Sequence, residues 1–237
     1  AEMHLVRCEE ALGRMRASVL ELLTNPRLRR AFQLANFAMH LQHSWDSSKS
    51  RHGPLRWRPF QLGFLLLSAP SSVARDHEHR GVMDLLWFPT GGGKTEAYLA
   101  LIACIAVYRR LSDDPNDHGG VCALMRYTLR LLTTQQFARS AAMIVALEAI
   151  RSGRVSSPAG LPLQGDEPFS IGLWVGGDAT PNKRAVAFAS LQGALEVSSP
   201  KQLSRCPVCG EKLKWSMASA ISPVDVECTN RSCKMCG

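Results

Sequence analysis

The chain has 237 residues, of which 46% are hydrophobic and 20% are charged, and its formal net charge is +8. This length allows one large domain or one good core with a small appendage, and the composition excludes a disordered chain. The positive charge suits a nucleic-acid partner without requiring one. The apolar run at 97–107 is the longest, and it is far too short to cross a bilayer.

The chain begins at Ala1 with neither a methionine nor a secretory signal pattern. We therefore expect that the first residues were lost or that this is a piece of a longer protein, and we expect it to be cytoplasmic, with no membrane partner. Apolar residues recur at helical spacing over 3–24, and Asn25-Pro26 supplies a cap and a first-turn proline for a second helix that reaches about residue 43. Together these features predict a helical N-terminal region over 1–50.

Beyond a polar connector, apolar runs alternate with helical stretches. Near-continuous apolar strands that alternate with helices are typical of a parallel sheet covered on both faces. We therefore predict an open α/β domain over 51–200. The predicted strands span 82–88, 121–127 and 169–175, and the predicted helices span 94–110, 131–150 and 182–195.

A glycine-rich loop lies between the first predicted strand and its helix. Three consecutive glycines let backbone N–H groups turn inward as a nest for phosphate oxygens, and the helix start adds its positive dipole end. We expect Lys94 to contact the β and γ phosphates of ATP and the Thr95 hydroxyl to bind Mg²⁺, which makes these two the candidate catalytic residues. The alternative is a glycine-rich turn without a ligand. The predicted ATP-binding residues of the loop are Thr90, Gly91, Gly92, Gly93, Lys94 and Thr95.

Two features of the nucleotide site resemble those of superfamily 2 helicases and translocases. Phe88 stands where the general phosphate-binding loop has its first glycine, and motif I of these motors also lacks that glycine. About thirty residues upstream, the segment WRPFQ resembles their adenine-reading R-P-[FY]-Q element. Gln61 is the candidate, because an amide pairs with both the donor and the acceptor of adenine. The alternative is that Gln61 is an ordinary helix residue.

The segment after the second predicted strand, RYTLRLLTTQQ, resembles motif Ia of the same motors, which contacts a nucleic-acid backbone. The alternative is a solvated helix start. Similarly, Gly176-Gly177 after the third predicted strand resembles the glycine pair of the motif Ib region, although a plain turn is nearly as good an interpretation. The predicted DNA-contacting residues are Arg126, Arg130, Thr133, Thr134 and Gln135.

Five of the eight cysteines crowd the end of the chain. The series Cys206-x₂-Cys209, eighteen residues, then Cys228-x₄-Cys233 fits a structural four-thiolate Zn²⁺ site. An alternative set replaces Cys228 with Cys236, and spacing alone does not choose between the two. The remaining interpretation is a set of free thiols.

Several segments together resemble one family of superfamily 2 DNA helicases, the helicase subunit of DISARM anti-phage systems (the DrmA-like group). They are NPRLRRAFQLANFAMHLQ, WRPFQLGFLLL, WFPTGGGKTEAYLAL, RYTLRLLTTQQFARSA, IGLWVGGDATPN and CPVCG. The resemblance covers about 25–233, and it corresponds to the N-terminal part of a longer protein. It implies that 51–200 is a partial first RecA-like ATPase domain and that 201–237 is a zinc ribbon with the set Cys206, Cys209, Cys228 and Cys233. It also implies action on phage DNA with a partner subunit.

One departure from this family concerns catalysis. A motor needs an Asp-Glu pair after an apolar strand to hold Mg²⁺ and orient water, and no segment of this chain has that pattern. We therefore expect weak ATP binding and no appreciable ATPase activity from these residues alone. The alternatives are another class of phosphate-loop ATPase, or a non-enzymatic zinc-ribbon module that docks nucleic acid or protein and carries a vestigial loop.

Overall fold

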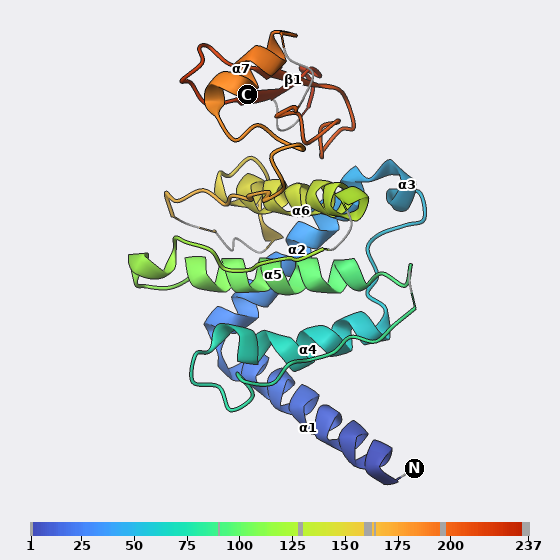
Figure 1. Ribbon diagram of the computed structural model, residues 1–237. Helices are drawn as coiled ribbons and strands as arrows, with labels where there is room; N and C mark the ends of the chain where they lie inside the picture. The colour runs from blue at the N-terminus through green and yellow to red at the C-terminus, as the bar shows by residue number, and fades with distance from the viewer. Residues whose placement is uncertain are drawn as a thin grey trace. The chain divides into compact units, whose positions relative to one another are not determined.

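The computed structural model describes residues 2–89, 91–127, 130–158, 163, 165–194 and 198–233 (Figure 1). The chain divides into two compact units. The first unit comprises Ala1–Arg126 and Ala146–Phe169, and the second comprises Tyr127–Val145 and Ser170–Gly237. In the described part the α-helices are α1 (Glu2–Thr24), α2 (Pro26–Trp45), α3 (Ser47–Ser50), α4 (Pro59–Val73), α5 (Lys94–Arg110), α6 (Arg130–Arg151) and α7 (Arg184–Leu191).

The structure confirms three of the predicted helices, which are α1, α2 and α5. The side chain of Asn25 accepts a hydrogen bond from the backbone N–H of Leu28 at 3.0 Å, and Pro26 occupies the first turn of α2. This cap satisfies one of the free N–H groups at the helix start. α5 begins and ends at the predicted residues, whereas α4 was not among the predicted elements. None of the helices in the described ranges is long and apolar enough to cross a membrane.

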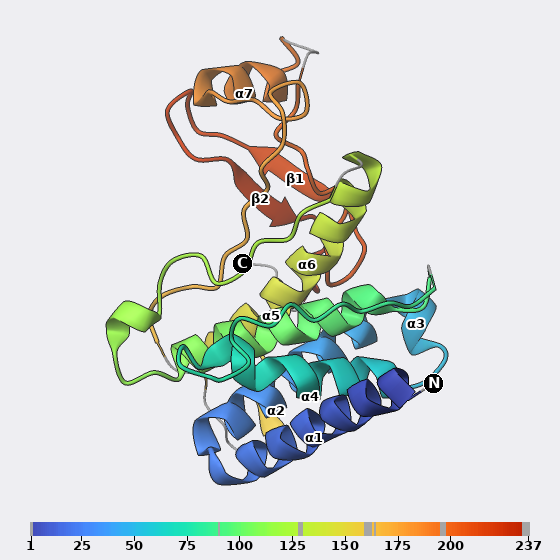
Figure 2. The same cartoon turned by 60° about the horizontal axis from the view of Figure 1, so that its bottom comes forward.

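The core of the first unit lies where α5 packs against both α2 and α4, while α1 packs on α4 (Figures 1 and 2). The buried residues of α2 recur at three- and four-residue intervals, which places them on one face of that helix. Fully burying each large apolar side chain contributes about 1.5–3 kcal/mol. The largest fully buried side chains of α2, α4 and α5 are Leu28, Leu34, Met39, Leu65, Leu99, Cys104 and Val107.

Two polar clusters hold the ends of this unit together. Asp84 accepts hydrogen bonds from both terminal nitrogens of Arg14 in α1, at 2.9 and 3.2 Å, and from the hydroxyl of Ser68 in α4. Near the end of the unit, Arg110 is buried, donates to the carbonyl oxygen of Pro168 at 2.8 Å, and lies over the ring of Phe169. Each cluster therefore ties a loop to a helix.

The second unit contains α7 and the two strands β1 (Leu213–Ser216) and β2 (Asp225–Cys228). The strands pair antiparallel, with Leu213 opposite Cys228 and Ser216 opposite Asp225. A cross-strand ion pair joins Lys214 and Glu227, whose nitrogen and oxygen lie 3.7 Å apart. Both side chains are largely exposed, so this pair contributes little to stability.

The expected RecA-like parallel sheet is wrong. In the described residues the fold is mostly helical, and β1 and β2 form its two-stranded sheet. The segments 82–88, 121–127 and 169–175 run without strand pairing, and many of their apolar side chains face solvent. Met83 is 90% exposed, Leu124 84% and Trp174 99%. A strand forms through hydrogen bonds to a neighbouring strand, and within the described chain these segments have no such neighbour.

Candidate functional site

The glycine-rich loop turns sharply between the segment 82–88 and the start of α5. Gly91 and Gly93 have φ angles of +79° and +90°, a backbone region that side chains other than glycine rarely adopt. Gly93 is the residue before the first turn of α5, so the free N–H groups of that helix face the loop. The N–H of Gly92 donates to the carbonyl oxygen of Pro89 at 3.1 Å. Binding of phosphate by this loop stays a prediction. Thr90 lies outside the described residues.

Gln61 connects α4 to this loop. Its side-chain oxygen accepts a hydrogen bond from the backbone N–H of Arg58 at 2.8 Å, and its nitrogen donates to the carbonyl oxygen of Gly93 at 2.7 Å. The side chain is buried. A Cβ atom at Gly93 would lie 2.8 Å from the Gln61 nitrogen, so a glycine is needed there for space as well as for its backbone angle. The structure thus places Gln61 against the glycine-rich loop. The contact of Gln61 with adenine stays a prediction.

Two further contacts between the same segments were missed from the sequence. The Arg58 side chain donates to the carbonyl oxygen of Gly92 at 3.0 Å. Phe60 stacks on Phe88, with ring centroids 3.8 Å apart and planes 17° from parallel. The aromatic residue that replaces the first glycine of the loop therefore packs on the start of α4. The signal was available, because Arg58, Phe60 and Gln61 all belong to the segment WRPFQ.

Lys94 and Thr95 lie at the start of α5, as expected. The ammonium group of Lys94 donates hydrogen bonds to the carbonyl oxygens of Phe88 and Pro89. Thr95 is partly exposed. The Lys94 ammonium group therefore lies at Phe88 and Pro89, the residues that precede the glycines, and its contact with phosphate stays a prediction.

The residues predicted to contact DNA fall in different parts of the chain. Arg126 is exposed at the end of a first-unit segment, whereas Thr134 and Gln135 are exposed near the start of α6 in the second unit. The side chains of Arg130 and Thr133 lie outside the described residues. Their roles in DNA binding stay predictions. The glycine pair forms a turn in which Gly177 approaches the Asn182 amide so closely that a Cβ atom would lie 2.9 Å away.

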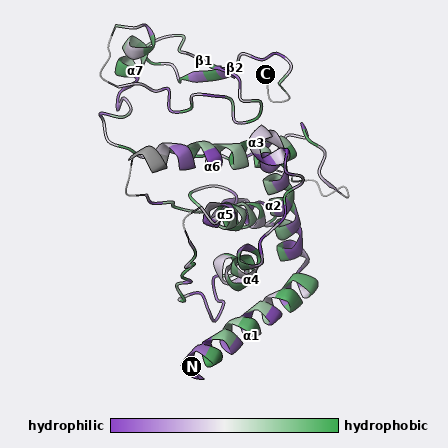
Figure 3. Ribbon diagram, turned by 90° about the vertical axis from the view of Figure 1, so that its right-hand side faces the viewer, coloured by the Kyte–Doolittle hydropathy of each residue, from purple (hydrophilic) through white to green (hydrophobic). Residues whose placement is uncertain are grey.

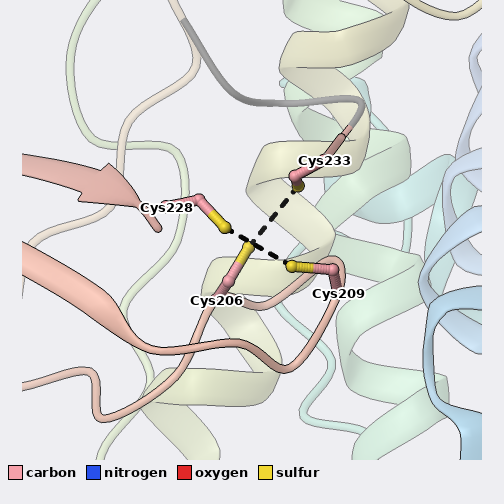
Figure 4. Close-up of side chains that lie close together, drawn as sticks. All are labelled: Cys206, Cys209, Cys228 and Cys233. Atoms are coloured by element: carbon pink, nitrogen blue, oxygen red, sulfur yellow. Dashed lines mark hydrogen bonds between the residues drawn. The ribbon is translucent and has the colours of Figure 1, made fainter. Parts of the chain in front are cut away.

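Four cysteines of the second unit come together in space, as Figure 4 shows. Their sulfur atoms all lie within 4.8 Å of one another, and the members of this set are Cys206, Cys209, Cys228 and Cys233. The Cys206 and Cys233 sulfurs are 3.9 Å apart, and the Cys209 and Cys228 sulfurs are 3.4 Å apart. These distances are much longer than the ~2.05 Å of a disulfide bond. Cys236, the alternative fourth ligand, lies outside the described residues.

Local backbone structure explains how the four thiols meet. Residues 206–210 make a tight turn in which the N–H of Gly210 donates to the carbonyl oxygen of Cys206 at 3.0 Å, with Gly210 at a φ of +74°. The N–H of Cys206 donates to the carbonyl oxygen of Glu211, and β2 ends at Cys228 beside β1. The turn and the end of the strand pair thus bring both halves of the cysteine set to one place.

The geometry fits a tetrahedral zinc ion. Zn–S bonds of about 2.3 Å imply sulfur–sulfur distances of about 3.8 Å, which lies within the observed range. Burial opposes ionisation of the Cys209 thiol, but the backbone N–H of Glu211 and the neighbouring thiols outweigh it and lower the pKa of Cys209. For Cys228, burial and the adjacent thiols raise the pKa to about 12. Four thiols packed this closely ionise together only beside a cation, so a divalent metal ion is the ligand that this set fits.

The described chain thus has two candidate sites, a glycine-rich loop at a helix start and a four-thiol cluster, and no family model matches the chain. The chain is 36% identical to the DISARM protein DrmA of Bacillus paralicheniformis, over 95% of this chain. It spans only 22% of the length of that relative. The match confirms the resemblance to the DrmA-like group and fits a DrmA-like fragment.

Proposed function

We propose that this chain is the ATP-binding portion of an ATP-dependent superfamily 2 DNA helicase or translocase that acts in anti-phage defence of the DISARM type. The observation that carries the proposal is the contact between the buried Gln61 amide and the carbonyl oxygen of Gly93. This contact joins the segment expected to bind adenine to the loop expected to bind phosphates. The similarity to the DISARM protein DrmA supports the role in defence.

In this proposal each residue of the loop has a separate role in binding ATP and Mg²⁺. The N–H groups of Gly91, Gly92 and Gly93 would hold phosphate oxygens, that of Gly92 in place of its present bond to the carbonyl oxygen of Pro89, and Lys94 would contact the β and γ phosphates. Thr95 supplies an oxygen ligand to Mg²⁺. The segment around Arg126 binds the DNA backbone. A second subunit of the defence system and the rest of the motor are partners of the longer protein.

The test of ATP binding uses this chain and a fluorescent ATP analogue with Mg²⁺. We expect saturable binding that Lys94→Ala weakens by about tenfold to a hundredfold, because a hydrogen bond to a charged group contributes about 1.5–3 kcal/mol. Lys201→Ala is the matched control, since Lys201 is an exposed lysine of the second unit. Equal affinity for the wild type and Lys94→Ala would contradict the proposed role of the loop.

Activity is tested in a polypeptide extended past Gly237. We expect DNA to stimulate its ATP hydrolysis and Lys94→Ala to abolish that stimulation, whereas the 237-residue chain should turn over no appreciable ATP. The cysteine cluster supports a second candidate function, a non-enzymatic zinc-ribbon module that docks nucleic acid or protein. An extended wild type that binds DNA without any stimulated hydrolysis would favour this module over the motor.

A further inference from the structure

Helix α1 has an apolar outer face that no other part of the described chain covers. The inner face of α1 packs on α4, where the Met15 sulfur lies 3.5 Å from the position a Cβ would take at Gly63. Figure 3 shows hydrophobic residues along the whole of α1, interspersed with hydrophilic ones. The large apolar residues of this outer face are between 42% and 64% exposed, and they are Leu5, Val6, Leu12, Val19, Leu20 and Leu23.

Two opposite charges lie in the middle of this outer face. Glu9 falls between Leu5 and Leu12, and Arg16 falls between Leu12 and Val19. They are seven residues apart, which places them two turns or about 10.5 Å apart along the helix, whereas pairing within a helix needs a separation of three or four residues. Neither makes an ion pair with another described residue. An apolar surface that covered this face would bury both charges at a high cost.

We propose that the outer face of α1 binds the same face of a second copy of the chain, with the two helices antiparallel. A two-fold axis between residues 12 and 13 places Glu9 of each copy opposite Arg16 of the other. The same register sets Leu5 opposite Leu20, close to the middle of the face. Glu9 and Arg16, the charges in the middle of the face, then each have an opposite partner across the axis, while Leu12 lies opposite Gly13.

Gly13 makes this register possible at the centre of the contact. It lies opposite Leu12 of the second copy, and no atom lies within 4 Å of the position its Cβ would take. The two helix backbones can therefore approach closely there, as small residues allow. A parallel pair in register would instead place Glu9 against Glu9 and Arg16 against Arg16, so the charges select the antiparallel arrangement. The interface is self-complementary and closes at two copies.

Sedimentation equilibrium of the chain over a wide concentration range tests this proposal. We expect a monomer–dimer equilibrium. Glu9→Arg places like charges opposite each other twice across the axis, and Arg16→Glu does the same with the opposite sign, so each should weaken the dimer about tenfold or more. The double variant, Glu9→Arg with Arg16→Glu, restores both opposite-charge pairs and should restore the dimer. High salt should reduce the difference between the single variants and the wild type.

Glu10→Arg is the matched control, because Glu10 is exposed on α1 but turned about 100° from Glu9 around the helix. It should dimerise as the wild type does. All four variants change surface charges on one helix, and circular dichroism verifies that each keeps its helical content. A chain that stays monomeric at every concentration overturns the proposal, and this is the result if another polypeptide covers the face. A dimer that the single variants leave intact, or that the double variant fails to restore, overturns it as well.

Discussion

The two candidate sites rest on very different amounts of packed structure. The glycine-rich loop is attached to α4 and α5, whose buried side chains form the core of the first unit together with α2. The cysteine cluster lies in a region with few large buried side chains. Among the described residues of 170–233, the buried apolar ones are Ala187, Cys206, Val208, Met217 and Cys233.

This difference indicates whether each candidate site needs its ligand in order to fold. In the first unit, buried apolar side chains of α2, α4 and α5 hold the helices that carry the loop. Within 170–233 of the second unit, two of the five buried apolar residues of the described chain are themselves members of the cysteine cluster, so a bound metal would take the place of a larger core there. Removing a ligand should therefore change function in the first unit and folding in the second.

The largest effect is expected from Cys206→Ser in the cysteine cluster. With three thiols the site loses its tetrahedral set, and structural zinc sites contribute about 10–16 kcal/mol to the folding of small zinc domains. We expect bound zinc to fall from one per chain to a small fraction, and amide hydrogens of β1 and β2 to exchange freely. Elemental analysis and hydrogen exchange measure these two changes.

Cys122→Ser is the matched control, because Cys122 is a free cysteine outside the cluster. It should keep one zinc per chain. In both variants the amide hydrogens of α2 and α5 should stay protected, since the core of the first unit contains no member of the cluster. Stoichiometric zinc in Cys206→Ser would show that the four thiols are not the binding site, and loss of protection in α5 would show that the two regions fold as one.

An intermediate effect is expected from Gln61→Ala in the first unit. The change leaves the N–H of Arg58 and the carbonyl oxygen of Gly93 without their partner, which costs about 1–3 kcal/mol at a buried position. Urea unfolding measures this loss of stability. Because α4 keeps its core contacts, hydrogen exchange should increase most at 91–95, next to the lost contact.

Gln33→Ala is the control, since Gln33 is an exposed glutamine of α2 in the same unit. It should unfold within about 0.5 kcal/mol of the wild type. An unchanged stability of Gln61→Ala, with unchanged exchange at the loop, would mean that the buried amide does not hold the loop. ATP binding by Gln61→Ala distinguishes a residue that only positions the loop from one that also contacts adenine. The affinity is measured at a lower temperature, where the variant is fully folded. A reduced affinity under those conditions indicates that Gln61 contacts adenine.

The features that could be predicted from the sequence depend on neighbours along the chain. A cap such as Asn25 acts on an N–H three residues away, and the start of α5 at Lys94 follows directly from the glycines before it. The cysteine set was predicted in part by spacing, because a turn of five residues fixes Cys206 relative to Cys209. These interactions are local, so a pattern in the sequence records them.

The prediction of a parallel sheet was wrong because an apolar run indicates a preference for burial. It does not indicate that a neighbouring strand is present to pair with. The run at 82–88 has the composition of a buried strand, yet Met83 and Trp87 are 90% and 88% exposed. Pairing depends on a second segment far away in the sequence. The contacts of Arg58 and Phe60 with the loop were missed for the same reason, since they join positions about thirty residues apart.

The smallest effect is expected from Glu148→Gln in α6. Glu148 lies beside the polar cluster formed by Arg110, Pro168 and Phe169 near the end of the first unit. Glu148 accepts hydrogen bonds from the Arg151 guanidinium at 2.8 Å and from the N–H of Phe169 at 3.0 Å. Burial opposes its ionisation, but these contacts outweigh it, so the pKa of Glu148 lies below its ordinary value of 4.5. A lowered pKa stabilises the folded state above pH 4.5, and the stabilisation is lost as the pH falls through the folded-state value.

At pH 7 Glu148→Gln should therefore be less stable than the wild type by about 1 kcal/mol, a partly buried ion pair being worth little more. The difference should be the same at pH 6 and shrink below pH 4.5, where the wild-type carboxylate also loses its charge. Urea unfolding at each pH measures it, and Glu10→Gln, an exposed glutamate of α1, should show no comparable pH dependence. A gap that stays constant down to pH 3 would mean that the shape of the side chain, and not its charge, holds Phe169 to α6.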